Sequence, residues 1–400
     1  MAPATESQSS FLSRISIRRN QIVSMEVNHE QELQELESFQ KYVAGRFSEL
    51  LCPPPLSAGN IDAGANSPPS DPILSISWLR KLLDVFMSCE AEFKTVLITG
   101  PGPGPGPGRD PFQISKPPLD RVVPEMLDRV VKALDICTAV VNGVDSVRDC
   151  QRLAEIAVTA LKQRPLSDGS VRRAKRALTS LLNALNPEEK GSRNGSGSSG
   201  RRTTERSWSF SRRNGGGYVS KNWSAAKQIQ AMTANLIAPR GTEASSPAAL
   251  PVHIISTIMV LVMWVLVAAV PCQTSNGLPT HLPLPKHQSW ASAAINIHDR
   301  IGEEIKRKER RGGGFSGGLM EEMQRMERIG MGLMEFAEGF RSAEEVAEKV
   351  AEMEEVCRRM EELDGLQRQV REVFHRMVRS RTEILEALDQ AGRNTTPPPL

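Results

Sequence analysis

Apolar residues recur every three or four positions through much of this chain, which is the pattern of amphipathic helices. The series predict helices over residues 22–51, 71–97, 123–144, 153–161 and 171–185. Asp71 before Pro72 marks the expected start of the second helix, and Pro124 fits the third only if it lies in the first turn. Strand-type alternation is scarce, so we predict an all-α protein built as a multi-helix bundle.

The C-terminal part shows the longest periodic series. Ser342 and Glu345 have the spacing of a capping box, which predicts a helix start. The apolar positions that follow are Val346, Val350, Met353, Cys357, Met360, Leu363, Leu366, Val370, Val373 and Met377, with Ile384 and Leu388 beyond. This spacing predicts a coiled-coil-like seam. We expect this seam and the first amphipathic helix to bind partners or to mediate self-association.

A charge-free apolar run, Val252 to Val270, lies between Pro251 and Pro271. At about 1.5 Å per residue, a helix of this length matches the hydrocarbon thickness of a bilayer. The residues expected to contact lipid are Val252, Ile254, Ile255, Leu261, Trp264, Leu266 and Val270. The run therefore predicts a membrane segment, single-pass or peripheral, with the N-terminal part in the cytosol. The alternative is a core helix buried in a large cytosolic bundle.

Changes in composition divide the chain into helical parts and linkers. The predicted units are a flexible N-terminus (1–20), an N-terminal helical region (21–185), a disordered Gly/Ser/Arg-rich linker (186–221), a short helix with connector (222–250), the apolar helix (251–271), a Pro-rich loop (272–288), a C-terminal helical region (289–390) and a flexible tail (391–400). Within the first helical region, PGPGPGPG is a spacer, because alternating proline removes the amide donors that a phosphate-binding loop needs.

The Gly/Ser/Arg-rich linker carries too few aliphatic residues to fold alone. Ser207, Ser209 and Ser211 lie close to arginines, a context that suits a basophilic kinase, so they are candidate phosphorylation sites. Three readings stay open for this linker: a disordered tether, a phosphorylated or anionic-lipid-binding patch, and a nucleic-acid or nuclear-import segment. A phosphate there would weaken attraction to an anionic membrane.

Charge and chemistry exclude several classes of protein. The 400 residues contain 50 basic and 47 acidic side chains, a net charge of +3, and no recognisable nucleic-acid-binding module, so no nucleic-acid partner is expected. The six cysteines are scattered without metal-ligand spacing, as in a reduced compartment. HExxH and a complete P-loop are absent. We therefore expect a protein that is not an enzyme and has no cofactor.

Several stretches resemble the BYPASS-related proteins of plants, in the ROH-type branch described as interactors of an exocyst subunit. They are HEQELQELESFQKYVAGRFSELL, LSISWLRKLLDVFMSCEAEFKTVL, LDRVVPEMLDRVVKALDICTAVVNGVD, LAEIAVTALKQRPLSDGSVRRAKRALTSLL, NWSAAKQIQAMTANLIAPRG and VREVFHRMVRSRTEIL. The resemblance implies an all-helical, non-enzymatic protein whose partner is an exocyst subunit. It also implies roles in secretion, cell-wall or mucilage deposition and organ development, and a membrane segment at the apolar run.

The membrane segment and the bundle make conflicting demands on the chain. If helices on both sides of the apolar run belong to one bundle, a true span would place a bilayer between them. Either the two halves are independent, or the run is buried or only dips into the membrane. The leading hypothesis is a membrane-associated helical adaptor that binds membrane lipid and an exocyst subunit. The alternatives are a soluble regulator of developmental signalling whose core contains the apolar run, and an enzyme of a mobile-signal pathway.

Overall fold

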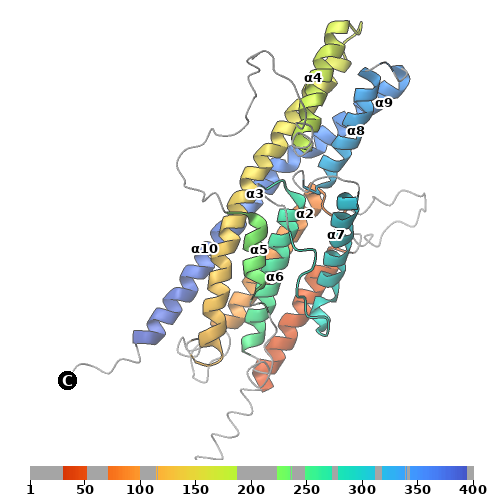
Figure 1. The fold of residues 1–400 in the computed structure, drawn as a ribbon. Coiled ribbons are helices and arrows are strands. Elements are labelled where there is room, and N and C mark those ends of the chain that lie inside the picture. Colours follow the sequence, from red (N-terminus) through yellow and green to blue (C-terminus); the bar gives the residue numbers. More distant parts are fainter. Residues whose placement is uncertain are drawn as a thin grey trace, which may run out of the picture.

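A computed structural model describes residues 30–51, 71–99, 114, 116–186, 223–234, 236, 248–272, 278–310, 318–337, 339 and 343–393. Over these residues the protein is a bundle of helices without a strand, which confirms the predicted all-α class (Figure 1). A first helix covers residues 30–49. The labelled helices are α2 Ile76–Lys94, α3 Leu119–Leu161, α4 Asp168–Leu185, α5 Ala225–Thr233, α6 Ala249–Ala269, α7 Ser292–Arg310, α8 Glu321–Ala337, α9 Ala343–Arg359 and α10 Leu363–Arg393.

The bundle is elongated, and α3 and α10 are its longest members (Figure 1). The apolar helix α6 packs against α2, α3, α5 and α7. At the other end, α4 packs between α3 and α8, and α8 packs on α9. Because α10 contacts both α2 and α3, helices from before and after α6 share one bundle. The two halves of the described chain are therefore not independent.

The second helix begins later than Asp71, the start that the sequence suggested. Ser75 is its N-cap, and the Ser75 hydroxyl accepts a hydrogen bond from the Trp78 amide at 3.2 Å. The carboxylate of Glu322, from α8, accepts the Ile76 amide at 3.1 Å. Leu74 before the cap has a positive φ of 68°, which breaks the helical path. The start is thus set partly by a residue far away in sequence.

The third and fourth predicted helices are one continuous helix, α3, of 43 residues. Pro124 lies inside it, beyond the first turn, so the expectation that restricted this proline to the first turn was wrong. A proline there deprives the carbonyl four residues earlier of one hydrogen bond. The apolar side chains around it, Val123, Met126 and Leu127, are buried, and their packing outweighs that single loss.

Helix α8 was not predicted, because Gly330 and Gly332 interrupt a methionine-rich series in which Met323, Met326 and Leu333 still face the core. The strand-like VLIT run is a π-helical turn, Thr95–Thr99, that extends α2. The long C-terminal series is confirmed as α9 and α10, joined by one 3-10 turn, Met360–Glu362.

Candidate interaction site

The predicted membrane segment forms the centre of the bundle. All seven residues expected to contact lipid are at most 5% exposed: Val252, Ile254, Ile255, Leu261, Trp264, Leu266 and Val270. Among the described residues, α6 is the one helix long and apolar enough to cross a membrane, and 94% of its most apolar window is buried by the protein itself. Membrane contact stays a prediction, and the burial of α6 favours the alternative of a core helix.

The C-terminal end of α6 is capped by the protein. The Leu319 amide donates to the carbonyl of Ala268 at 2.9 Å, and the Met320 amide donates to the carbonyl of Ala269 at 3.0 Å. Gly318 makes this approach possible, because its φ is +70° and a Cβ there would lie 2.5 Å from the Ala269 oxygen. The last carbonyls of a helix have no partner within the helix. Those of Ala268 and Ala269 therefore find their hydrogen-bond donors inside the protein.

Polar contacts also hold the middle of α6. Trp264 donates from Nε1 to the carbonyl of Pro279 at 2.7 Å, and its ring lies 4.9 Å from the His298 ring on α7. His298 accepts the Leu282 amide at Nε2, 3.2 Å away. A neutral ring then carries its proton on Nδ1, 3.0 Å from a carboxylate oxygen of Asp299. The segment 278–310 thus packs against α6 and accepts the hydrogen bond of the Trp264 indole.

The two seams expected to bind partners are used inside the bundle. In the first helix, Phe39, Val43 and Phe47 are fully buried. In the C-terminal series, every seam residue from Val346 to Met377 is at most 6% exposed. Helix packing within one chain covers these apolar faces, so partner binding through them stays a prediction that this packing disfavours.

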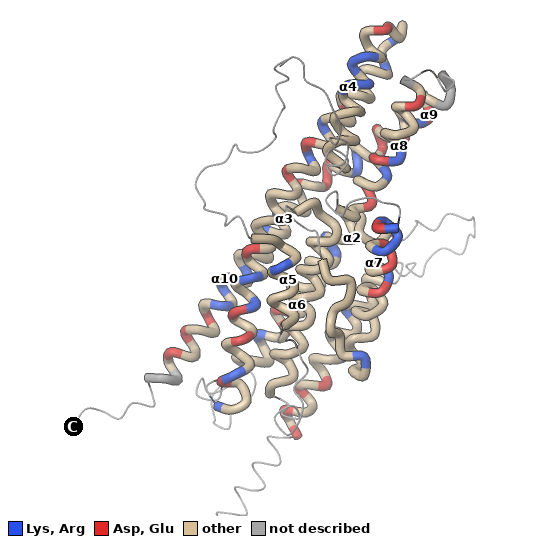
Figure 2. Tube along the Cα trace, in the orientation of Figure 1, with Lys and Arg blue, Asp and Glu red and all other residues tan. Residues whose placement is uncertain are grey.

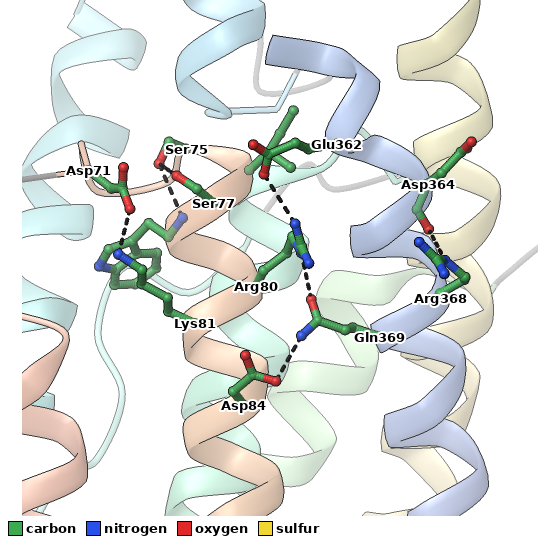
Figure 3. Close-up of polar contacts among 12 residues, drawn as sticks. Asp71, Ser75, Ser77, Arg80, Lys81, Asp84, Glu362, Asp364, Arg368 and Gln369 are labelled. Carbon is green, nitrogen blue, oxygen red and sulfur yellow. Dashed lines mark hydrogen bonds and ion pairs between the residues drawn. The ribbon is translucent and has the colours of Figure 1, made fainter.

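Polar contacts fix the position of α10 against two neighbours. Arg80 of α2 donates to Gln369 at 3.0 Å and to Glu362 at 3.2 Å, as Figure 3 shows. On the α3 side, Gln367 donates to Asp145 at 3.0 Å, and Arg148 pairs with Asp364. These contacts set an antiparallel register between α3 and α10.

A carboxyl group is buried where α2 and α10 meet. Glu90 is 9% exposed and accepts a hydrogen bond from the Ser380 hydroxyl. Burial raises the pKa of Glu90, while Ser380, Lys94 and Arg376 act in the opposite direction. A cavity of about 30 Å³ beside it is lined by residues of α2, α3, α6 and α10. It is far smaller than a ligand pocket and has room for about one water.

No group of three or more potential metal ligands occurs in the described part of the chain. Burial raises the pKa of the thiols of Cys89, Cys137, Cys150, Cys272 and Cys357 to about 12. Such thiols are poor nucleophiles. The candidate phosphorylation sites Ser207, Ser209 and Ser211 lie outside the described residues.

The outer side of α10 carries a second apolar strip that the sequence reasoning missed. Val378 is 39% exposed and Leu385 is 38% exposed, and half-buried Phe374 continues the strip. Their spacing of four and seven residues was visible in the sequence. The much longer buried seam on the same helix concealed it.

Arginines line the same helix beside this strip. Figure 2 shows basic and acidic residues along α10. The arginines on the outer face are Arg368, Arg371 and Arg379, which border a shallow surface depression together with Glu372, His375 and Arg376. The described chain is therefore a large helical bundle with buried seams and an outer face on α10 that combines apolar and basic side chains.

This chain belongs to the ROH1-like family, whose model, described as Protein ROH1-like, matches residues 2–388. Protein ROH1A of Arabidopsis thaliana is 58% identical over 427 residues, which covers 99% of this chain and 100% of the relative. Protein ROH1D of the same plant is 36% identical over 429 residues, with 98% and 99% covered. No solved structure matches the chain.

Proposed function

We propose that this protein is a non-enzymatic adaptor that binds an exocyst subunit and thereby modulates secretion, with effects on cell-wall or mucilage deposition and on organ development. Membership of the ROH1-like family and the sequence blocks of the exocyst-interacting branch support this proposal. The observation that carries it is the outer face of α10, which combines exposed apolar and unneutralised basic groups on a rigid helix. Such a face is typical of interaction surfaces.

We propose that the adaptor contacts the membrane peripherally and faces the cytosol, with α6 kept in the core. The support is energetic. Extracting α6 into lipid would remove its contacts with α2, α3, α5 and α7 and would expose their buried faces. It would also break the bonds from Leu319 and Met320 that cap the helix. Lipid could replace the apolar environment but not these directed contacts.

Binding of purified exocyst subunits to the immobilised full-length protein tests the adaptor proposal. We expect one subunit to be retained from a panel that is presented singly, at salt concentrations near physiological. The matched control is the chain after heat denaturation, which keeps the composition and loses the surface. Retention of none of the subunits by the folded protein would contradict the proposal.

The second candidate function is a soluble regulator of developmental signalling, and the burial of α6 favours it as much as it favours a peripheral adaptor. The two differ in their partner. A soluble regulator predicts a stable, active protein that binds no exocyst subunit, whereas the adaptor loses its role when that contact is lost. Complementation of a mutant plant by a variant selectively deficient in subunit binding would favour the soluble regulator.

A further inference from the structure

We infer that the groove between α3 and α10 binds one amphipathic helix of a partner protein. The side of this partner helix that faces α10 carries acidic residues. The inference rests on the proposed adaptor function and assigns its protein contact to a specific surface. The term groove is used here for the surface strip along the boundary of the two helices, formed by Val131 and Leu134 of α3 and by Phe374, Val378 and Leu385 of α10. Val131, Val378 and Leu385 are exposed, and half-buried Leu134 and Phe374 continue the apolar surface between them.

The two walls of the groove are placed by contacts deeper in the bundle. The small cavity beside Glu90 is lined by Leu127 and Val130 of α3 together with Met377 and Arg381 of α10. With the antiparallel register set by Gln367 and Asp145, Leu134 lies level with Val378, and Val131 lies level with Arg381, about one turn further along α10. Val131 is 43% exposed, close to the value for Val378. The floor therefore continues from one helix to the other.

The two rims of the groove differ in charge. On α10, Arg371 and Arg379 are exposed, and no described carboxylate forms an ion pair with either. On α3, Asp135 is exposed on the outer edge, and Asp128, about two turns earlier, already pairs with Lys132. An incoming helix with acidic side chains over α10 would meet two unpaired guanidinium groups. Complementary charge of this kind fixes orientation and speeds association.

The size of the floor favours a single helix over a second copy of the chain. Phe374 and Leu385 are eleven positions apart, so the strip is about 16 Å long at 1.5 Å per residue. That length accommodates roughly three turns of a partner helix that presents residues i, i+3, i+4 and i+7. Standard interfaces between whole proteins use roughly 800 Å² of each partner, so a strip of this length suits the insertion of one helix better than the docking of a whole second chain.

Fluorescence polarisation with two labelled helical peptides of about 18 residues tests the inference. Both peptides carry leucines along one stripe; the first has glutamates on one edge and lysines on the other, and the second has lysines on both. We expect the full-length protein to bind the first at least about tenfold more tightly than the second. Arg371→Glu with Arg379→Glu should reverse that order. The matched control, Arg172→Glu with Arg173→Glu on exposed α4 positions, should leave it unchanged.

Val378→Asp tests the apolar floor, and an unchanged thermal unfolding curve shows that the variant is folded. We expect it to bind the first peptide at least about tenfold more weakly. Equal affinity of the wild type for both peptides, or unchanged binding by Val378→Asp, would overturn the inference. So would a concentration-dependent dimer that Val378→Asp abolishes, because the groove would then hold a second copy.

Retention of an exocyst subunit, measured for the wild type and for Val378→Asp, distinguishes failure of this inference from failure of the proposed function. If Val378→Asp still retains the subunit, the groove assignment fails and the adaptor proposal stands. If the wild type discriminates between the peptides as expected but retains no subunit, the groove assignment stands and the adaptor proposal fails.

Discussion

Helices α6 and α10 are both long and rich in apolar residues, but they use them differently. In α6 the apolar residues cover the whole circumference, and all of them from Val252 to Ala269 are at most 5% exposed. In α10 one face is buried, and a separate strip with Val378 and Leu385 remains on the surface. Of these two helices, α10 alone therefore keeps apolar side chains available to another molecule.

The difference shows that hydrophobicity alone does not identify a surface or a membrane span. An apolar helix is satisfied equally by lipid and by neighbouring helices. What distinguishes the two environments here is the set of directed contacts to α6, from the indole of Trp264 to the capped carbonyls of Ala268 and Ala269. Exposed apolar side chains beside unpaired charged groups, as on α10, indicate a binding surface better than hydrophobicity alone does.

The largest expected effect comes from replacing one leucine by alanine in each of the two helices. Leu261→Ala in α6 should lower the free energy of unfolding by about 2–5 kcal/mol, because it leaves a cavity in a closely packed core. Leu385→Ala in α10 should cost less than about 1 kcal/mol, because its side chain already faces water. Urea unfolding of both variants measures the contrast. Equal losses would mean that α6 is not packed as described.

A smaller effect is expected from adding one methyl group where α3 meets the end of α6. A Cβ on Gly143 would lie 2.7 Å from Cγ1 of Val270 and 2.8 Å from the carbonyl oxygen of Pro271. Gly143→Ala should therefore destabilise the fold by about 1–3 kcal/mol. Gly45→Ala, at an exposed position where nothing lies within 4 Å, is the control and should stabilise the first helix by up to about 1 kcal/mol. Thermal melts of both variants distinguish these signs, and stabilisation by Gly143→Ala would refute the close approach.

The smallest effect concerns pH and the contact between α2 and α10. The pKa of Glu90 is raised in the folded state, so its contribution to stability is fully present below the unfolded pKa and is lost as pH rises through the folded pKa. Glu90→Gln should therefore gain stability relative to the wild type as pH rises from 4 to 8. Exposed Glu372→Gln on α10 is the matched control. Denaturant midpoints across this range provide the measurement, and a pH-independent difference would contradict the assignment.

Helical periodicity predicted most of the fold. It located the first helix, α2, α4 and the long C-terminal series, because each has enough apolar residues on one face to reveal its period. It missed α8, where Gly330 and Gly332 weaken the helical pattern, and it could not know that Glu322 of α8 caps α2. Contacts between residues this distant in sequence leave no local signal.

The candidate site was less predictable than the fold. The sequence identified the seams correctly as apolar faces but could not show that helices of the same chain cover them. It also could not decide between lipid and protein around Trp264, because both environments favour the same residues. The strip from Phe374 to Leu385 becomes visible as a surface only when the buried face of α10 is known.

Alkaline carbonate extraction of microsomes that carry the full-length protein tests most directly whether α6 is a core helix. We predict that the protein is released into the supernatant while an integral membrane marker stays in the pellet, because α6 is covered by α2, α3, α5 and α7. Retention of the protein with the marker would contradict the account. In that case α6 would lie in the bilayer, and the helices that now surround it would have to separate.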